Sequence, residues 1–249
     1  MTVLAPLFLL LLAPVAGSFL GTLAVRLPKG ETVVFDRSRC AACGRTLGPR
    51  DLVPILSWLV TRGRCRHCGA AVSRFYPAVE LAALGIAVWV LAVLPGWLAW
   101  AGAGLGWVLL TLAVIDARHT LLPDVLTLPL IPAGLLVAWA VAPPQVVDHA
   151  IGAVAGFAVF AAIAWAYRRV RGREGLGLGD AKLLAAGGAW AGWMGLASIV
   201  VWASVLALIA ALVSGGIRGT LSAKMPIPFG PFLALGIWLT WLYGPLRIG

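Results

Sequence analysis

The stretch Gly177-Leu178-Gly179-Asp180 lies where a basic loop ends and a long apolar run begins. An acidic residue at the start of an apolar membrane helix is costly, and such residues usually have a function. The neighbouring glycines have no Cβ, so a second backbone or a substrate chain can approach closely. A simpler interpretation is a turn with φ > 0 at glycine, followed by an aspartate that caps the helix. A second acid at the same membrane depth would favour the functional interpretation.

The composition of the chain predicts a membrane protein built from helices. Of its 249 residues, 61% are hydrophobic and 11% are charged, whereas soluble chains carry about 25% charge. Apolar runs close to the roughly 20 residues that a helix needs to cross a bilayer recur along the sequence. They are too long and continuous for the strands of a β-barrel. We therefore expect an all-α polytopic membrane protein with about eight transmembrane helices.

The expected spans follow these apolar runs and the turn signals between them. They are residues 3–24, 77–94, 97–115, 124–141, 150–167, two spans within 181–213 separated by a break near 190–195, and 229–243. Small residues recur in two of these runs, at Gly152 and Gly156 in one and at Gly187 and Gly188 in another. Such residues let membrane helices approach closely, so this pattern fits close helix packing in lipid.

The basic residues predict the orientation of the spans. With the N-terminus outside, the loops on the cytoplasmic side hold every Lys and Arg except Arg247, as the excess of positive charge in cytoplasmic loops requires. No basic residue precedes the first apolar run and a basic patch follows it, which is the opposite of a secretory signal. The net charge of +10 thus reflects these loops, and we expect no nucleic-acid partner.

Four cysteines form two CxxC pairs in one polar segment, Cys40-Ala41-Ala42-Cys43 and Cys65-Arg66-His67-Cys68. Two CxxC turns at this spacing can place four thiolates tetrahedrally around Zn²⁺. A short segment with few large apolar side chains needs such a staple to fold. We predict a structural zinc site, formed by Cys40, Cys43, Cys65 and Cys68, in a reducing compartment. A redox role for the thiols is the alternative.

Asp116 supplies the second acid, because its span ends on the side where that of Asp180 begins. Asp124 follows Pro123, where an acid suits a helix start, but Asp116 ends a helix, where its charge opposes the dipole. Two converging carboxylates share a proton, and such a pair can activate water and protonate a leaving amine. The alternative is a proton-coupled transporter with a regulatory zinc knuckle, although transporters usually place their acids near mid-membrane.

Together these motifs resemble the prepilin peptidases, or type IV leader peptidases, which are membrane aspartic proteases with a Gly-x-Gly-Asp motif. The resemblance covers nearly the whole chain. It is carried by Gly17-Ser18-Phe19-Leu20, Arg26-Leu27-Pro28, the two CxxC pairs, Pro54-Ile55-Leu56-Ser57-Trp58, Arg62-Gly63-Arg64-Cys65, Tyr76-Pro77 with Glu80, Ile115-Asp116, Leu122-Pro123-Asp124 and Gly177-Leu178-Gly179-Asp180-Ala181-Lys182-Leu183.

The resemblance implies that Asp116 and Asp180 are the catalytic pair. It implies supporting or substrate-binding roles for Gly177, Gly179, Lys182, Asp124 and Glu80, with Lys182 near the cleavage region or a lipid phosphate. The implied reaction is removal of the basic leader from prepilins or pseudopilins, at the cytoplasmic face of the bacterial inner membrane.

The resemblance also implies a second activity, N-methylation of the new N-terminal residue with S-adenosylmethionine. No glycine-rich fingerprint for this cofactor occurs in the sequence, so it is implied by the resemblance alone. The expected domains are a first transmembrane helix (1–25), a cytoplasmic double-CxxC segment associated with methylation (26–75), and a transmembrane aspartic peptidase domain (76–249).

Overall fold

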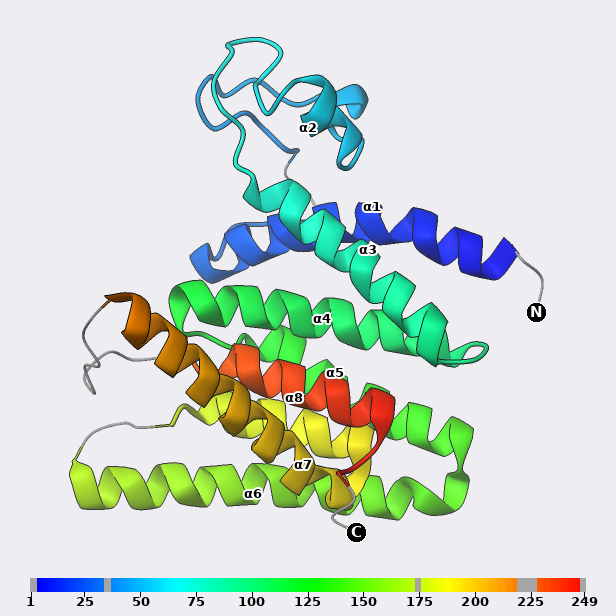
Figure 1. Ribbon diagram of the computed structural model, residues 1–249, viewed down its shortest axis with the longest axis vertical. Helices are drawn as coiled ribbons and strands as arrows, with labels where there is room; N and C mark the ends of the chain where they lie inside the picture. Colours follow the sequence, from blue (N-terminus) through cyan, green and yellow to red (C-terminus); the bar gives the residue numbers. More distant parts are fainter. Residues whose placement is uncertain (1–3, 34–36, 173–175, 219–227, 247–249) are drawn as a thin grey trace. The chain divides into compact units, whose positions relative to one another are not determined.

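The protein was analysed as a computed structural model, which describes residues 4–33, 37–172, 176–218 and 228–246 (Figure 1). Arg173, Lys224 and Arg247, which enter the charge argument above, lie outside the described residues. Within these ranges the chain is helical, and its only β-structure is two isolated bridges. The chain divides into two compact units, Met1–Thr111 (unit 1) and Leu112–Gly249 (unit 2). The predicted all-α architecture is confirmed.

Unit 1 contains two long helices and the cysteine segment. Its elements are α1 (Leu4–Arg26), η1 (Leu27–Lys29), η2 (Pro49–Asp51), α2 (Leu56–Val60), α3 (Phe75–Val93) and the larger part of α4 (Leu98–His119). Helices α1 and α3 cross in direct contact (Figure 1). At Gly17 a Cβ would lie 2.6 Å from the Cα of Glu80, so the crossing depends on the missing side chain.

Unit 2 begins with the last residues of α4 and is formed by four further long helices. These are α5 (Asp124–Val141), α6 (Val146–Arg171), α7 (Leu178–Arg218) and α8 (Gly230–Tyr243), with η3 (Pro143–Gln145) between α5 and α6. Helix α7 packs against α5, α6 and α8. A Cβ on Gly188 would overlap the backbone of Gly152, so α6 and α7 pack closely where both have glycine, as the pattern of small residues indicated.

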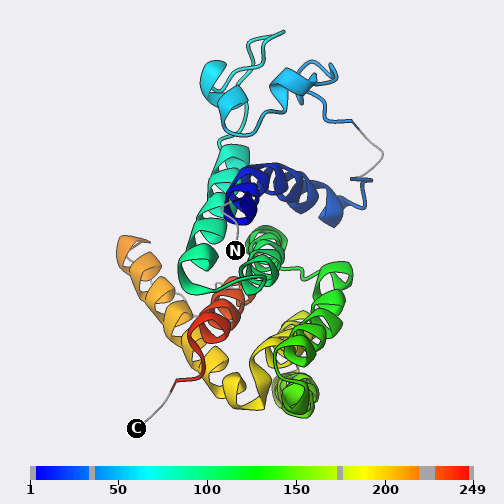
Figure 2. The same ribbon diagram turned by 90° about the vertical axis from the view of Figure 1, so that its right-hand side faces the viewer.

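Helix α7 contains both of the spans expected within residues 181–213. They are separated by Gly192, whose φ of 72° and ψ of 173° are not helical, and Figure 2 shows the bend between the yellow and orange parts of the helix. The predicted break near residues 190–195 is therefore confirmed, and glycine supplies the left-handed φ that it needs.

Six helices among the described residues are long and apolar enough to cross a membrane. They are α1 with η1, α3, α4, α5, α6 with η3, and α7. Helix α8 is apolar but has only 14 residues. The expected eight spans are reached only when both parts of α7 and the short α8 are counted.

Candidate functional site

Asp116 lies in the last turn of α4, in unit 2. The helix ends at His119 because Thr120 adopts a positive φ of 50°, and the N–H of Thr120 donates to the carbonyl oxygen of Asp116 at 2.8 Å. The Asp116 side chain is buried, with 6% of its surface exposed. Its Oδ2 accepts a hydrogen bond from the backbone N–H of Gly230 at 2.9 Å. Asp116 is thus held by the first residue of α8.

Gly230 is a residue that the sequence analysis did not single out. A Cβ at this position would lie 2.6 Å from Oδ2 of Asp116, so a larger residue would displace the carboxylate or the helix. The N–H that reaches Asp116 belongs to the N-terminus of α8, where a helix favours negative charge. This interaction offsets the unfavourable position of Asp116 near the C-terminal end of its own helix.

Asp180 is the third residue of α7, and its side chain turns back to the residue before the helix. Its Oδ2 accepts the N–H of Gly177 at 3.3 Å, as the acidic residue of a capping box does. Neither Gly177 nor Gly179 has a positive φ, so the simpler turn interpretation is wrong on this point. At Gly179 a Cβ would lie 3.0 Å from that of Leu122, so close approach is the reason for this glycine.

Asp116 and Asp180 are neighbours within unit 2, and they are close enough for the charge of one to act on the other. Each carboxylate accepts one backbone N–H through Oδ2. Among the described residues no cationic side chain pairs with either of them. Two carboxylates that meet without a cation are the arrangement in which acid–base catalysis by a shared proton is possible. Both lie in terminal turns of their helices, whereas the transporter interpretation needs acids near mid-span.

Asp124 and Lys182 form an ion pair in unit 2, close in sequence to this aspartate pair. The Nζ of Lys182 lies 2.7 Å and 2.8 Å from the two carboxylate oxygens of Asp124. Pro123 occupies the N-cap position of α5, and no side chain there caps the helix. The pair joins the first turns of α5 and α7, so Lys182 has a partner within the protein.

The two CxxC pairs lie in two similar turns of unit 1. In the first, the N–H of Cys40 donates to Arg45 and the N–H of Gly44 donates back to Cys40, both at 2.9 Å. The second repeats the pattern with the N–H of Cys65 on Ala70 at 2.8 Å and that of Gly69 on Cys65 at 2.9 Å. Both glycines have φ near 70°, at 68° and 71°. Each turn presents two thiols on one side, and the two turns face each other.

The four cysteine sulfurs form a compact cluster that fits a tetrahedral metal ion. All lie within 4.8 Å of one another, and those of Cys40 and Cys68 are 3.8 Å apart. A tetrahedral ion with metal–sulfur bonds of about 2.3 Å needs sulfurs about 3.8 Å apart. None of the four is in a disulfide. Backbone N–H groups of Cys43 and Ala42 lower the pKa of the Cys40 thiol to about 6, whereas burial and the other three cysteines raise the pKa of the Cys68 thiol to about 11.

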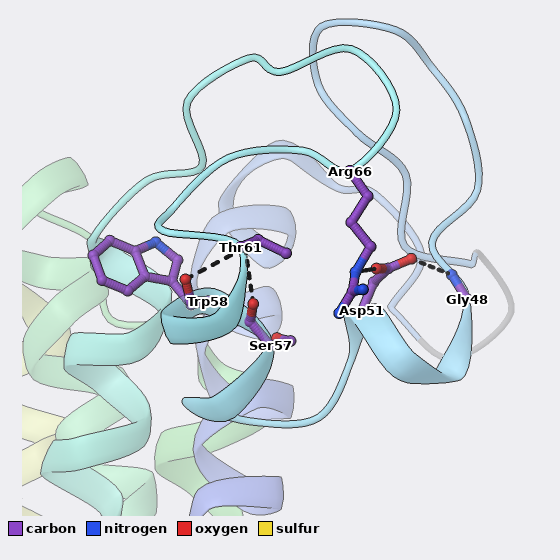
Figure 3. A network of polar contacts seen from close by, with 6 residues as sticks. All are labelled: Gly48, Asp51, Ser57, Trp58, Thr61 and Arg66. Carbon is purple, nitrogen blue, oxygen red and sulfur yellow. Dashed lines mark hydrogen bonds and ion pairs between the residues drawn. The ribbon is translucent and has the colours of Figure 1, made fainter.

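A polar network around α2 joins parts of the cysteine segment to one another (Figure 3). Arg66, inside the second CxxC pair, forms an ion pair with Asp51 at 2.8 Å. Asp51 also accepts the N–H of Gly48 at 3.2 Å. The hydroxyl of Thr61 donates to the carbonyl of Ser57 at 2.8 Å. The ion pair fixes the second cysteine turn to η2, and the Thr61 hydrogen bond closes the end of α2.

Glu80 lies in α3 of unit 1, so the structure places it in a different compact unit from the two aspartates. It is 5% exposed, and its Oε2 accepts the backbone N–H of Ile55 at 2.7 Å. Ile55 has φ 61° and ψ −54°, and the N–H of Leu56 bonds the carbonyl of Pro54. This is a γ-turn of the rare, strained kind. No sequence signal for this turn stands out beyond the stretch Pro54-Ile55-Leu56.

Comparison with known proteins supports the resemblance to the type IV leader peptidases over most of the chain. Residues 11–94 match the bacterial peptidase A24 N-terminal domain, and residues 103–212 match the type IV leader peptidase family. A curated protein of Aeromonas salmonicida is 43% identical over 213 residues, which cover 85% of this chain and 73% of that protein. One of Burkholderia pseudomallei is 42% identical over 219 residues (88% and 71%). One of Pseudomonas aeruginosa is 36% identical over 267 residues (94% and 89%).

Each of these relatives is named prepilin leader peptidase/N-methyltransferase. No solved structure matches the chain significantly.

Proposed function

The chain belongs to the type IV leader peptidase family, and we propose that it cleaves the basic leader from prepilin or pseudopilin precursors and then N-methylates the new N-terminal residue. The observation that carries the peptidase assignment is the proximity of Asp116 and Asp180, two carboxylates from different helices, neither of which forms an ion pair within the described ranges. The family supplies the substrate class.

In the proposed cleavage, the two aspartates share one proton. The ionised carboxylate takes a proton from water, whose oxygen attacks the scissile carbonyl carbon. The protonated partner stabilises the developing negative charge on the carbonyl oxygen. When the C–N bond breaks, the leaving amine takes a proton from the pair, which restores the starting state. The N–H groups of Gly230 and Gly177 hold the two carboxylates in place throughout.

We further propose that the four cysteines bind Zn²⁺ as a structural ion. A set of four thiolates at these distances suits zinc, and the two turns that carry them contain almost no apolar core. The ion then keeps the cysteine segment folded and takes no part in peptide cleavage.

The methyl donor of the second reaction is S-adenosylmethionine in this proposal. When bound, it supplies a methyl group to the lone pair of the substrate amine; the C–S bond breaks with its electrons left on sulfur, and the amine loses a proton to solvent. We propose that the chain lies in the bacterial inner membrane as a multi-pass protein with its N-terminus outside and the two aspartates at the cytoplasmic side.

Co-expression with a prepilin tests the peptidase. The parent chain should remove the leader, and Asp116→Asn or Asp180→Asn should slow removal about 10³-fold or more, because a catalytic unit fails when one member is lost. Asp148→Asn, which changes an exposed acid in the first turn of α6, is the matched control and should cleave normally. Cleavage at the parent rate by either of the first two variants would remove that residue from the mechanism.

A further inference from the structure

We propose that a cavity in unit 1 is the binding site for S-adenosylmethionine, and that Glu80 is the residue that recognises its sulfonium charge. The inference rests on the proposed methyl-transfer function, which requires a donor. It adds a cavity and a residue to the association of segment 26–75 with methylation, and neither follows from the resemblance.

The cavity is enclosed by three parts of unit 1. Helix α1 contributes Ser18 and Thr22, the segment around α2 contributes Trp58, and the first turns of α3 contribute Tyr76 and Glu80. The two cysteine turns complete the wall. The volume of about 520 Å³ lies within the roughly 300–1,000 Å³ of small-molecule sites. The cavity therefore has the size of a ligand site. Its walls are polar, aromatic and charged, with the acids Glu31, Asp51 and Glu80 beside four arginines, Arg26, Arg39, Arg64 and Arg66.

Glu80 is the feature that points to a cationic ligand. It is 5% exposed, and its single hydrogen bond within the described residues is the one from Ile55 to Oε2. Among those residues no Lys or Arg forms an ion pair with it. A buried carboxylate without a counter-charge is costly, and this one lines the cavity. A ligand with a positive group would supply the missing partner.

The backbone at Ile55 supports a site that is organised in advance. A β-branched residue at φ 61° costs free energy and persists only where its surroundings hold it, often at ligand sites. Here the Glu80 carboxylate holds the N–H of that residue. The same side chain thus fixes the strained turn and faces the cavity.

The aromatic walls fit the rest of the ligand. Trp58 is held by a hydrogen bond from its ring N–H to the carbonyl of Val72 at 3.2 Å, and a Cβ on Gly63 would lie 2.8 Å from the ring. Figure 3 shows Trp58 beside Ser57 and Thr61. A fixed indole can stack on an adenine ring or lie against a sulfonium. S-adenosylmethionine carries both groups, as well as an ammonium.

Ligand binding to the purified, zinc-loaded full-length chain in detergent tests the site. Calorimetry would compare S-adenosylmethionine with S-adenosylhomocysteine, which has the same shape but a neutral sulfur. Glu80→Gln keeps an oxygen for the N–H of Ile55 and removes the charge. We expect it to weaken S-adenosylmethionine about tenfold or more, because a buried attraction between opposite charges is lost, and to weaken S-adenosylhomocysteine much less. Trp58→Leu should weaken both, and Asp148→Asn neither.

The other outcomes overturn the proposal. Unchanged affinity of Glu80→Gln for S-adenosylmethionine would place the donor elsewhere, and equal loss of both ligands would make Glu80 a structural residue. Tighter binding of ATP than of S-adenosylmethionine would show an anion site. Leader cleavage and product mass are measured on the same variants. A parent chain that methylates its product while Glu80→Gln binds normally defeats this inference alone, whereas a parent that neither binds the donor nor methylates defeats the proposed second activity.

Discussion

The aspartate pair of unit 2 and the cysteine segment of unit 1 are held together by different forces. Asp116 is buried among apolar helices, and the backbone of α8 positions it. Between residues 37 and 74, by contrast, Gly63 and Cys65 are the only buried residues. A segment with so little core cannot fold by apolar burial. Helix packing therefore holds the aspartate pair in place, whereas the cysteine segment needs its bound ion to fold.

Removal of the metal should produce the largest difference between the two sites. Structural zinc contributes about 10–16 kcal/mol to small zinc-dependent folds, so chelation, or Cys40→Ser with Cys65→Ser, should unfold residues 37–74 and abolish methylation. Leader cleavage should persist, because the aspartate pair does not use the ion. Hydrogen exchange across the segment and the mass of the cleaved product measure the two effects. Full protection of the segment in metal-free protein would show that it folds without zinc.

Gly230→Ala should have the next largest effect, on cleavage alone. The new Cβ would lie 2.6 Å from Oδ2 of Asp116, and a misplacement of about 1 Å can cost about 10²-fold in rate. Single-turnover cleavage of a prepilin gives the measurement, and zinc content should stay unchanged. Gly104→Ala is the matched control, because its Cβ would meet nothing within 4 Å. A fully active Gly230→Ala would mean that the α8 contact does not position the acid.

Gly188→Ala tests the packing that unit 2 relies on. Its Cβ would overlap the backbone of Gly152, so the free energy of unfolding should fall by about 1–3 kcal/mol. Gly85→Ala adds the same methyl group to α3 in open space and should be neutral or slightly stabilising, since alanine favours a helix. Denaturant unfolding in detergent compares the two variants. Equal stability of both would show that α6 and α7 tolerate a wider separation.

The smallest effect is expected at the ion pair of Lys182 with Asp124. Both side chains are partly exposed, at 29% and 55%, and such pairs contribute about 0.2–1 kcal/mol. Lys182→Met, Asp124→Asn and the double variant should each change cleavage by less than about fivefold. In a double-mutant cycle the two effects should be coupled. A larger, uncoupled loss in Lys182→Met would instead favour the role near the substrate or a lipid phosphate that the resemblance implies.

Much of the fold could be predicted because long apolar runs leave little choice but helix in a membrane. The expected span 124–141 has the same bounds as α5, and the break near 190–195 lies at Gly192. The cysteine cluster could also be predicted from the sequence, because the CxxC spacing determines where the thiols point. The assignment of activities to residues 26–75 and 76–249, and the membrane orientation, stay predictions.

The sequence by itself determined the helices, the thiol cluster and the two acids, because periodicity, ligand spacing and the cost of a carboxylate beside an apolar helix are local properties. Only the tertiary structure decided which groups hold the Gly177–Asp180 stretch and Asp116 in place. The contacts of Gly230 with Asp116, of Lys182 with Asp124 and of Glu80 with Ile55 join residues 114, 58 and 25 positions apart. No local pattern encodes such contacts, because they depend on how distant helices pack.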